Sequence, residues 1–180
     1  MNRTSTVLQK SISRRGKPIP GAEDRQREIP GFDQRVFSSS RVVGVGAGGI
    51  MSHIAPMLAR KGIGDLSLVD GDTVEPSNLN RQRFYTRDIG ANKACALAQN
   101  LLAECIIATT ITSYAYRFQE AIEQGIDFGC DVAVCGVDNN PTRVAVSRYF
   151  RQRAIPVVFA AVSADGDPLR PGRGSASRRH

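Results

Sequence analysis

The chain has 180 residues, of which 41% are hydrophobic and 23% are charged, and its formal net charge is +7. This length and composition predict one folded domain and exclude a wholly disordered chain. No apolar run approaches the roughly 18 residues of a membrane-spanning helix, so we expect no membrane partner. Because the first twenty residues also lack a continuous apolar stretch, we expect a cytoplasmic location.

Apolar runs alternate with helical patterns from residue 41 onward. Strands that alternate with helices favour a parallel sheet with right-handed crossovers, so we predict an α/β fold: a Rossmann-like, mostly parallel sheet with helices on both faces. The predicted strands are 41–45, 65–70, 106–114, 131–135 and 155–161, and the predicted helices are 49–61, 91–104, 117–124 and 140–152.

The two ends of the chain differ from its middle. Residues 1–24 are polar and basic and are predicted to form a flexible leader, residues 25–165 the folded domain, and residues 166–180 a disordered basic tail. Residues 1–40 and 166–180 carry all the excess positive charge. Because nucleic-acid-binding domains concentrate positive charge on a folded face, we do not expect a nucleic-acid partner. A module that binds nucleic acid through its basic ends is the alternative.

The four cysteines are Cys95, Cys105, Cys130 and Cys135, and they form no C-x-x-C pair. Their spacing matches no zinc-binding pattern, so we predict reduced thiols and no zinc site in this chain. Cys130 and Cys135 flank an apolar run and are predicted to be buried.

A glycine-rich turn joins the first predicted strand to the first predicted helix. Gly46, Gly48 and Gly49 would let the backbone approach a phosphate, and the helix N-terminus would supply N–H donors. The alternative is a plain tight turn. Two features depart from the usual dinucleotide-binding pattern: Met51 occupies the third glycine position, and Pro56 lies inside the helix, where it is predicted to produce a kink.

Acidic residues follow the second predicted strand. Asp70 lies at its carboxyl end, where an acidic side chain commonly binds the ribose hydroxyls of a nucleotide. Asp72 follows two residues later. The alternative for Asp70 is a turn-forming role beside Gly71.

The polar stretch 71–89 is long for a connection in a compact domain, which is typical of a functional loop. It contains Asn78 and Arg81, and Lys93 follows near the start of the next helix. A triphosphate needs several fixed cations and donors, whereas a nicotinamide cofactor does not require this segment. The alternatives are that Asn78 is a helix cap and that both cations are solvated.

Asp138 follows the predicted strand 131–135. Ligands of open α/β sheets bind beyond the carboxyl ends of the strands, so Asp138, Asp70 and the glycine turn are predicted to face one crevice. A carboxylate at that position could hold Mg²⁺ against phosphates. The alternative is an Asx turn that begins the next helix.

These motifs together resemble the ThiF/MoeB/HesA family of ubiquitin-activating-enzyme-like adenylyltransferases. The resemblance covers roughly residues 24–165. It rests on the G-x-G-G turn and on three further segments: Leu58 to Gln82, with its D-G-D and N-L-N-R-Q sequences, Asp88 to Lys93, and Val137 to Arg143. It implies a Rossmann-like sheet that binds ATP with Mg²⁺ and adenylates the C-terminal glycine of a ubiquitin-like protein, often a sulfur carrier. Some members of the family instead act on a tRNA-bound carboxylate.

The resemblance also implies roles for individual residues. Asp70 would contact the ribose, and Asp72 and the glycines would complete the nucleotide site. Arg81, Lys93 and Asn78 would contact the phosphates, and Asp138 would hold magnesium. Arg25 is also implied in catalysis, because in the family this arginine reaches into the neighbouring subunit of a homodimer. A carboxylate would attack the α-phosphate and release pyrophosphate, and no general base is needed because the carboxylate is already ionised.

Members of this family continue well past the strand predicted at 155–161, often with paired zinc cysteines. We therefore expect that the C-terminal part of the family fold is missing and that the chain is truncated. One alternative is a catalytically inactive remnant that binds ATP or a partner. Another is an NAD(P)-binding Rossmann oxidoreductase, which would explain Asp70 and the glycine turn but would leave Asn78, Arg81 and Lys93 without a role.

Overall fold

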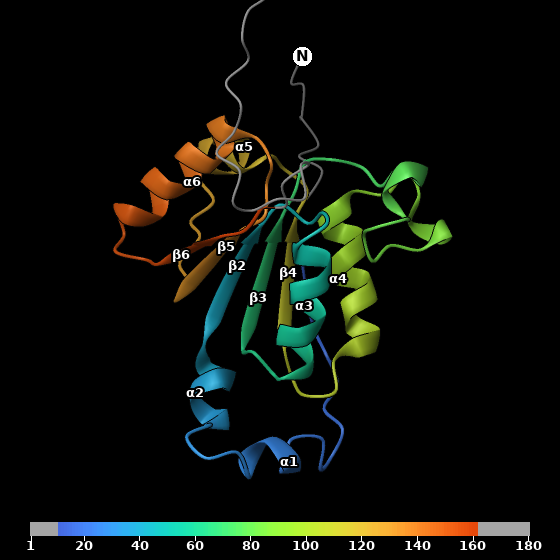
Figure 1. Ribbon diagram of the computed structural model, residues 1–180, viewed down its shortest axis with the longest axis vertical. Helices are drawn as coiled ribbons and strands as arrows, with labels where there is room; N and C mark the ends of the chain where they lie inside the picture. The colour runs from blue at the N-terminus through green and yellow to red at the C-terminus, as the bar shows by residue number, and fades with distance from the viewer. Residues whose placement is uncertain (1–10, 162–180) are drawn as a thin grey trace, which may run out of the picture.

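The computed structural model of the protein describes residues 11–161, which form a six-stranded sheet between two layers of helices (Figure 1). The strands are β1 (Ser11–Arg15), β2 (Arg41–Val45), β3 (Asp65–Val69), β4 (Thr110–Tyr114), β5 (Val132–Cys135) and β6 (Val157–Phe159). Their order is β1-β4-β3-β2-β5-β6, with β1 antiparallel to β4 and every other pair parallel. The predicted mostly parallel α/β sheet is confirmed.

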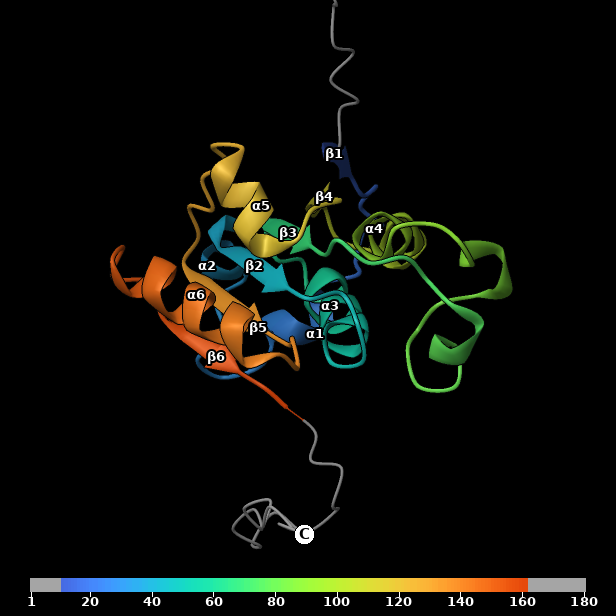
Figure 2. The ribbon, with the colours of Figure 1, turned by 90° about the horizontal axis from the view of Figure 1, so that it is seen from above.

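Helices cover the sheet on both faces, as predicted. Figure 2 shows α3 and α4 on one side of the strands and α5 and α6 on the other. The α-helices are α1 (Asp24–Arg27), α2 (Gln34–Ser39), α3 (Met51–Arg60), α4 (Lys93–Glu104), α5 (Phe118–Glu123) and α6 (Asn140–Arg151). Two short 3₁₀ turns, η1 (Pro76–Asn78) and η2 (Thr86–Asp88), lie in the polar stretch between β3 and α4.

The alternation of side chains along each strand supplies both layers of the core. Val42 and Leu66 are paired across β2 and β3 and pack with α3 and α4, whereas their neighbours Val43 and Val45 pack with α5 and α6. Since successive side chains of a strand point to opposite faces, an apolar run such as 41–45 is buried on both sides. This double burial fixes β2 in the centre of the sheet.

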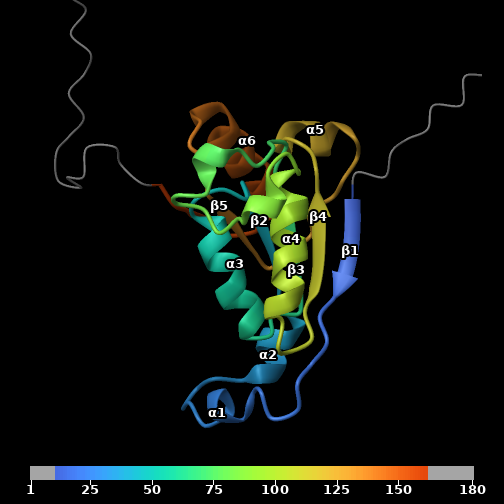
Figure 3. The same ribbon diagram turned by 90° about the vertical axis from the view of Figure 1, so that its right-hand side faces the viewer.

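Part of the predicted flexible leader is an edge strand. Within residues 1–24, Ser11–Arg15 forms β1 and pairs along β4, as Figure 3 shows. The polar composition of this segment does not indicate a strand, because an edge strand needs few apolar side chains when its backbone hydrogen bonds to a neighbour. Residues 1–10 and the predicted tail 166–180 lie outside the described residues.

Met51 occupies the third glycine position of the dinucleotide-binding pattern, at the start of α3. Met51 is completely buried, and its side chain lies against the backbone of Gly44 in β2. A Cβ at Gly44 would lie only 2.7–2.9 Å from three atoms of Met51. In the usual pattern a small residue on the helix allows the helix and the strand to pack closely. Here Gly44 of the strand is the small residue, and it leaves room for the side chain of Met51. Pro56 is also buried, and α3 runs through it from Met51 to Arg60.

The four cysteines are free thiols in the structure, and Cys130 and Cys135 are buried as predicted. Burial raises the pKa of Cys130 to about 11 and also raises the pKa of Cys135. These two thiols therefore remain protonated at neutral pH and pack as small apolar side chains. In the part of the chain that the structure describes, no helix has the length and apolar character needed to cross a membrane.

The contact between Gly44 and Met51 predicts a specific destabilisation. Gly44→Ala should lower the free energy of unfolding by about 1–3 kcal/mol, because the new methyl group overlaps a packed side chain. The double variant Gly44→Ala/Met51→Ala should lose less stability than the sum of the two single variants, since removal of the methionine relieves the overlap. Urea denaturation measures all three.

The matched control is Gly129→Ala, where the new methyl group would have only one neighbour, at an ordinary contact distance of 3.8 Å. A Gly44→Ala variant as stable as this control would contradict the packing argument.

Candidate functional site

The glycine turn lies between β2 and α3, at the carboxyl edge of the sheet. Gly46 has a φ of +88°, a left-handed conformation that residues with a side chain rarely adopt. A Cβ at Gly46 would also lie 2.8 Å from Cγ1 of Val137. This close approach brings the segment that follows β5, with Asp138 next along the chain, beside the glycine turn.

Asp70 connects the end of β3 to the glycine turn. One carboxylate oxygen, Oδ2, accepts a hydrogen bond from the backbone N–H of Ala47 at 2.7 Å, and Oδ1 accepts one from the N–H of Asp72 at 2.8 Å. Burial raises the pKa of Asp70 and the charge of Asp72 adds to the rise, whereas the two N–H bonds and Lys93 lower it. The structure thus brings Asp70 and the turn together, as predicted, and the contact with ribose stays a prediction.

Asn92 is a structural residue that the sequence analysis missed. Its side-chain Nδ2 donates to the carbonyl oxygens of Asp70 at 2.7 Å and Asp72 at 3.1 Å, while its Oδ1 accepts from the N–H of Cys95 in the first turn of α4. One side chain therefore caps α4 and ties it to the end of β3. An asparagine immediately before a predicted helix is the signal that could have identified this cap.

Lys93 is the first residue of α4 and is held at the same edge of the sheet. Its side chain is only 13% exposed, and its Nζ lies 3.3 Å from Oδ2 of Asp72. Its backbone N–H donates to the carbonyl of Asp72 at 2.9 Å. The predicted site residues Lys93 and Asp72 therefore form an ion pair, in which Asp72 orients the cation, and Lys93 is not freely solvated.

Asn78 is buried and has a structural role. Its Oδ1 accepts a hydrogen bond from the N–H of Glu75 at 3.0 Å, and its carbonyl accepts one from the N–H of Gln82 at 2.9 Å. The capping role that we considered for Asn78 is therefore present. A contact between Asn78 and phosphate stays a prediction.

Arg81 is exposed and its side chain lies along its own loop. Its Nη1 donates to the carbonyl of Ser77 at 2.8 Å and to Oδ1 of Asn80 at 3.1 Å. Its backbone carbonyl lies 3.2 Å from Nε2 of His53 in α3. The backbone of Arg81 is thus fixed near the glycine turn, and its guanidinium would have to leave these two acceptors to reach a ligand.

Asp138 is exposed, and its carboxylate forms no hydrogen bond or ion pair with another described residue. The Asx cap of α6 is formed instead by Asn139, whose Oδ1 accepts from the N–H of Thr142 at 2.9 Å. Within residues 11–161, no three His, Cys, Asp or Glu side chains gather into a metal cluster. A single carboxylate suits Mg²⁺ that is held mainly by phosphates and water, so the residues present are compatible with that ion.

Arg25 lies far from the other predicted site residues. It belongs to α1, which Figure 1 shows at the amino end of the strands, opposite the glycine turn. Its side chain is 95% exposed and lies 3.7 Å from Glu28. Within one chain, Arg25 is therefore not brought into the site.

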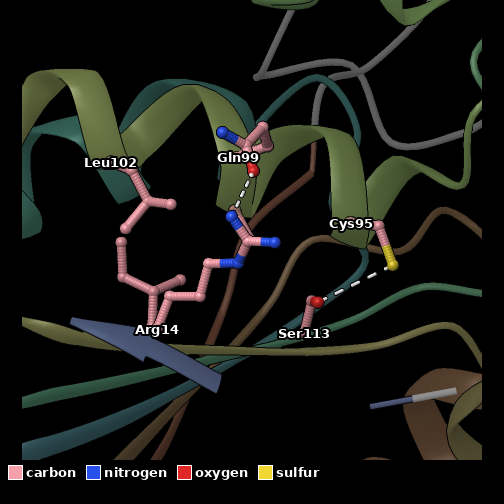
Figure 4. A pocket seen from close by; sticks show the side chains of 7 residues that line it. Arg14, Cys95, Gln99, Leu102 and Ser113 are labelled. Atoms are coloured by element: carbon pink, nitrogen blue, oxygen red, sulfur yellow. Dashed lines mark hydrogen bonds between the residues drawn. The ribbon is translucent and has the colours of Figure 1, made fainter. Parts of the chain in front are cut away.

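A small pocket lies beside α4 but does not include the predicted site. Figure 4 shows two hydrogen bonds at this pocket. Arg14 of β1 donates to Gln99 of α4, and Ser113 of β4 donates to the sulfur of Cys95. The lining residues are Arg14, Cys95, Ala98, Gln99, Leu102, Ile111 and Ser113. None of the predicted site residues lines this pocket.

The parallel sheet, with its glycine turn at the carboxyl ends of the strands, defines a Rossmann-like domain. The chain belongs to the ThiF family, whose sequence profile matches residues 23–170. It is 36% identical over 128 residues to the SAMP-activating enzyme E1 of Haloferax volcanii, and 34% identical over 130 residues to the sulfur carrier protein adenylyltransferase of Thermus thermophilus. These alignments cover 69% and 72% of the chain.

Solved structures give the same assignment. The chain is similar to Escherichia coli MccB in a crystal structure with ATP, with a TM-score of 0.64 and 28% identity over 71% of the chain. It is also similar to Escherichia coli tRNA N6-threonylcarbamoyladenosine dehydratase, with a TM-score of 0.61 and 28% identity over 70% of the chain. The matches cover 38% and 53% of those chains, and 46% and 48% of the two curated relatives above. The chain therefore spans about half or less of these proteins.

The burial of Asp70 predicts a pH dependence of stability. A carboxyl whose pKa is raised by folding contributes stability below its unfolded pKa of about 3.8, and this contribution is lost as the pH rises through the raised value. Asp70→Asn has no such titration, so the free energy of unfolding of the wild type relative to this variant should fall as the pH increases. Urea denaturation at several pH values measures the difference, and a rising difference would contradict the effect of burial.

Proposed function

We propose that the protein is an ATP-dependent adenylyltransferase. It would activate the C-terminal carboxylate of a ubiquitin-like or sulfur-carrier protein as an acyl-adenylate and release pyrophosphate. Membership of the ThiF family and the similarity to adenylyltransferases that act on sulfur carriers support this reaction class. Because the chain spans only part of those relatives, the reaction and the substrate are proposals for this chain.

The observation that supports the proposal is the set of hydrogen bonds that links the glycine turn, the end of β3 and the start of α4 at the carboxyl edge of the sheet. Asp70 fixes the glycine turn through Ala47, Asn92 fixes the start of α4 to Asp70, and Lys93 lies at that helix start with its largely buried side chain paired to Asp72. The carboxylate proposed to bind ribose, a turn of backbone N–H groups and a cation are thereby held on one framework. This combination suits a nucleotide with a charged phosphate chain.

The proposed chemistry depends on position and charge. Lys93 and Arg81 would neutralise the phosphate oxygens, which gain charge as pyrophosphate departs, and the N–H groups of the glycine turn would bind the same oxygens. Mg²⁺, when bound, would supply further positive charge at the phosphates, and Asp138 would hold it. The substrate carboxylate needs no base, so these residues orient the two reactants and stabilise charge.

The proposal extends to assembly and location. Arg25 is exposed at the opposite end of the sheet, so it would serve the reaction only from the neighbouring subunit of a homodimer. A cytoplasmic location would supply ATP and keep the four thiols reduced.

The reaction predicts measurable exchange of labelled pyrophosphate into ATP when a ubiquitin-like or sulfur-carrier partner is present. Lys93→Ala and Asp138→Ala should each lower the exchange rate by about 100-fold or more, because each removes a charge contact that strengthens as charge develops. Lys61→Ala removes an exposed lysine at the end of α3 and is the matched control. It should exchange at the wild-type rate.

Calorimetry with ATP and Mg²⁺ distinguishes the alternatives. Binding without exchange, across a panel of such partners, would replace the proposed enzyme with a protein that binds ATP without turnover. Binding of NADH in preference to ATP would favour the oxidoreductase. A folded wild-type protein that binds neither nucleotide would overturn the proposal.

A further inference from the structure

The last residue of α4, Glu104, has a carboxylate that is shared by two arginines. Its Oε1 accepts a hydrogen bond from Nη2 of Arg83 at 3.2 Å, and its Oε2 accepts one from Nε of Arg60 at 3.1 Å. The side chain of Glu104 is only 15% exposed, whereas those of Arg83 and Arg60 are 43% and 56% exposed. Because both oxygens of a largely buried carboxylate are paired, this network holds its partners more firmly than an isolated surface ion pair does.

The two arginines come from different parts of the molecule. Arg60 is the last residue of α3, and Arg83 lies in the loop between β3 and α4. The backbone of Arg83 is also held, because its N–H donates to Oγ of Ser52 at 3.2 Å, and Ser52 is completely buried in the first turn of α3. Glu104 and Arg83 therefore connect this loop to both ends of α3.

Arg83 lies two residues from Arg81, which is proposed to act at the phosphates. The side chain of Arg81 bonds only to its own loop, and its carbonyl meets His53 in an exposed contact of 3.2 Å. Arg83, in contrast, is held by a largely buried carboxylate and a buried hydroxyl. The position of the Arg81 backbone therefore depends in part on how firmly Arg83 is held.

We propose that Glu104 is a positioning residue, which holds the loop through Arg83 so that Arg81 lies where the adenylyltransferase reaction needs it. This inference rests on the proposed function. Among the described residues, the carboxylate of Glu104 bonds to the two arginines and to no predicted site residue. The bonds that link the glycine turn, the end of β3 and the start of α4 do not include Glu104. Loss of its charge should therefore loosen the loop and leave that framework intact.

Glu104→Gln removes the charge but keeps the shape of the side chain. With a sulfur-carrier partner present, the maximal rate of labelled pyrophosphate exchange should fall about 10-fold or more, because a small displacement of a group that stabilises charge is costly. The KM for ATP should stay within about twofold of the wild-type value, since a contact made mainly in the transition state changes kcat. A purely structural defect would not separate the two constants in this way.

The matched control is Arg60→Gln, which removes the other partner of the same carboxylate and leaves the pair with Arg83 in place. This variant should keep the wild-type exchange rate. Hydrogen–deuterium exchange of the backbone amides of residues 79–89, read by mass spectrometry, does not depend on activity. It should be faster in Glu104→Gln than in the wild type and unchanged in Arg60→Gln.

Equal hydrogen–deuterium exchange in Glu104→Gln and the wild type would overturn the inference. An equal loss of rate in Arg60→Gln would also overturn it, because the effect would then belong to the contact between α3 and α4. In both cases an active wild type leaves the proposed function in place. A wild-type protein without pyrophosphate exchange would overturn the proposed function, and the positioning role with it.

Discussion

The carboxylate of Asp70 is the interaction on which the arrangement of the candidate site depends. It joins the turn after β2 to the turn after β3, because its two oxygens accept from the N–H groups of Ala47 and Asp72. Neither N–H lies within a regular strand or helix, so without this carboxylate both would need another partner. Burial opposes the charge that makes the carboxylate a strong acceptor, and the two hydrogen bonds offset part of that cost.

Hydrogen bonds between its two ends hold the long loop between β3 and α4 in place. The N–H of Lys93 bonds to the carbonyl of Asp72, the N–H of Val74 bonds to Ala91, and Asn92 bonds back to the end of β3. These bonds hold the two ends of the loop together, so its middle can carry Arg81 and Gln82 over the first turn of α3. Val74 and Phe84 of this loop are also buried in the core beside α3 and α4, so the hydrogen bonds at its base and these two side chains together hold it in a defined position.

The sequence was sufficient to predict the strands β2 to β6 and the helices α3 to α6, because their apolar patterns are strong. It did not predict the short helices α1 and α2, which lie before the first apolar run. Strand 41–45 has the predicted bounds, whereas β1 was missed because its pairing with β4 depends on a partner almost a hundred residues away. Within the site, the acidic and basic residues follow from motif and spacing. The roles of Asn92, Ser52 and His53 do not, since they arise from hydrogen bonds to backbone groups brought close only by the fold.

Gly44 and Met51 show that the glycine motif reflects a need for space between a helix and a strand, which different residues can meet. A helix can approach a strand closely when either surface lacks a side chain, and here the strand supplies the gap that Met51 fills. Gly46 meets the same requirement where Val137 approaches, whereas a Cβ at Gly48 would lie at an ordinary contact distance from the amide of Gln82. A Cβ built on Gly49, two residues before α3, would meet no atom within 4 Å, so space remains on that side of the turn. The departure at Met51 therefore leaves free the side of the turn where the proposed phosphate site lies, next to the start of a helix.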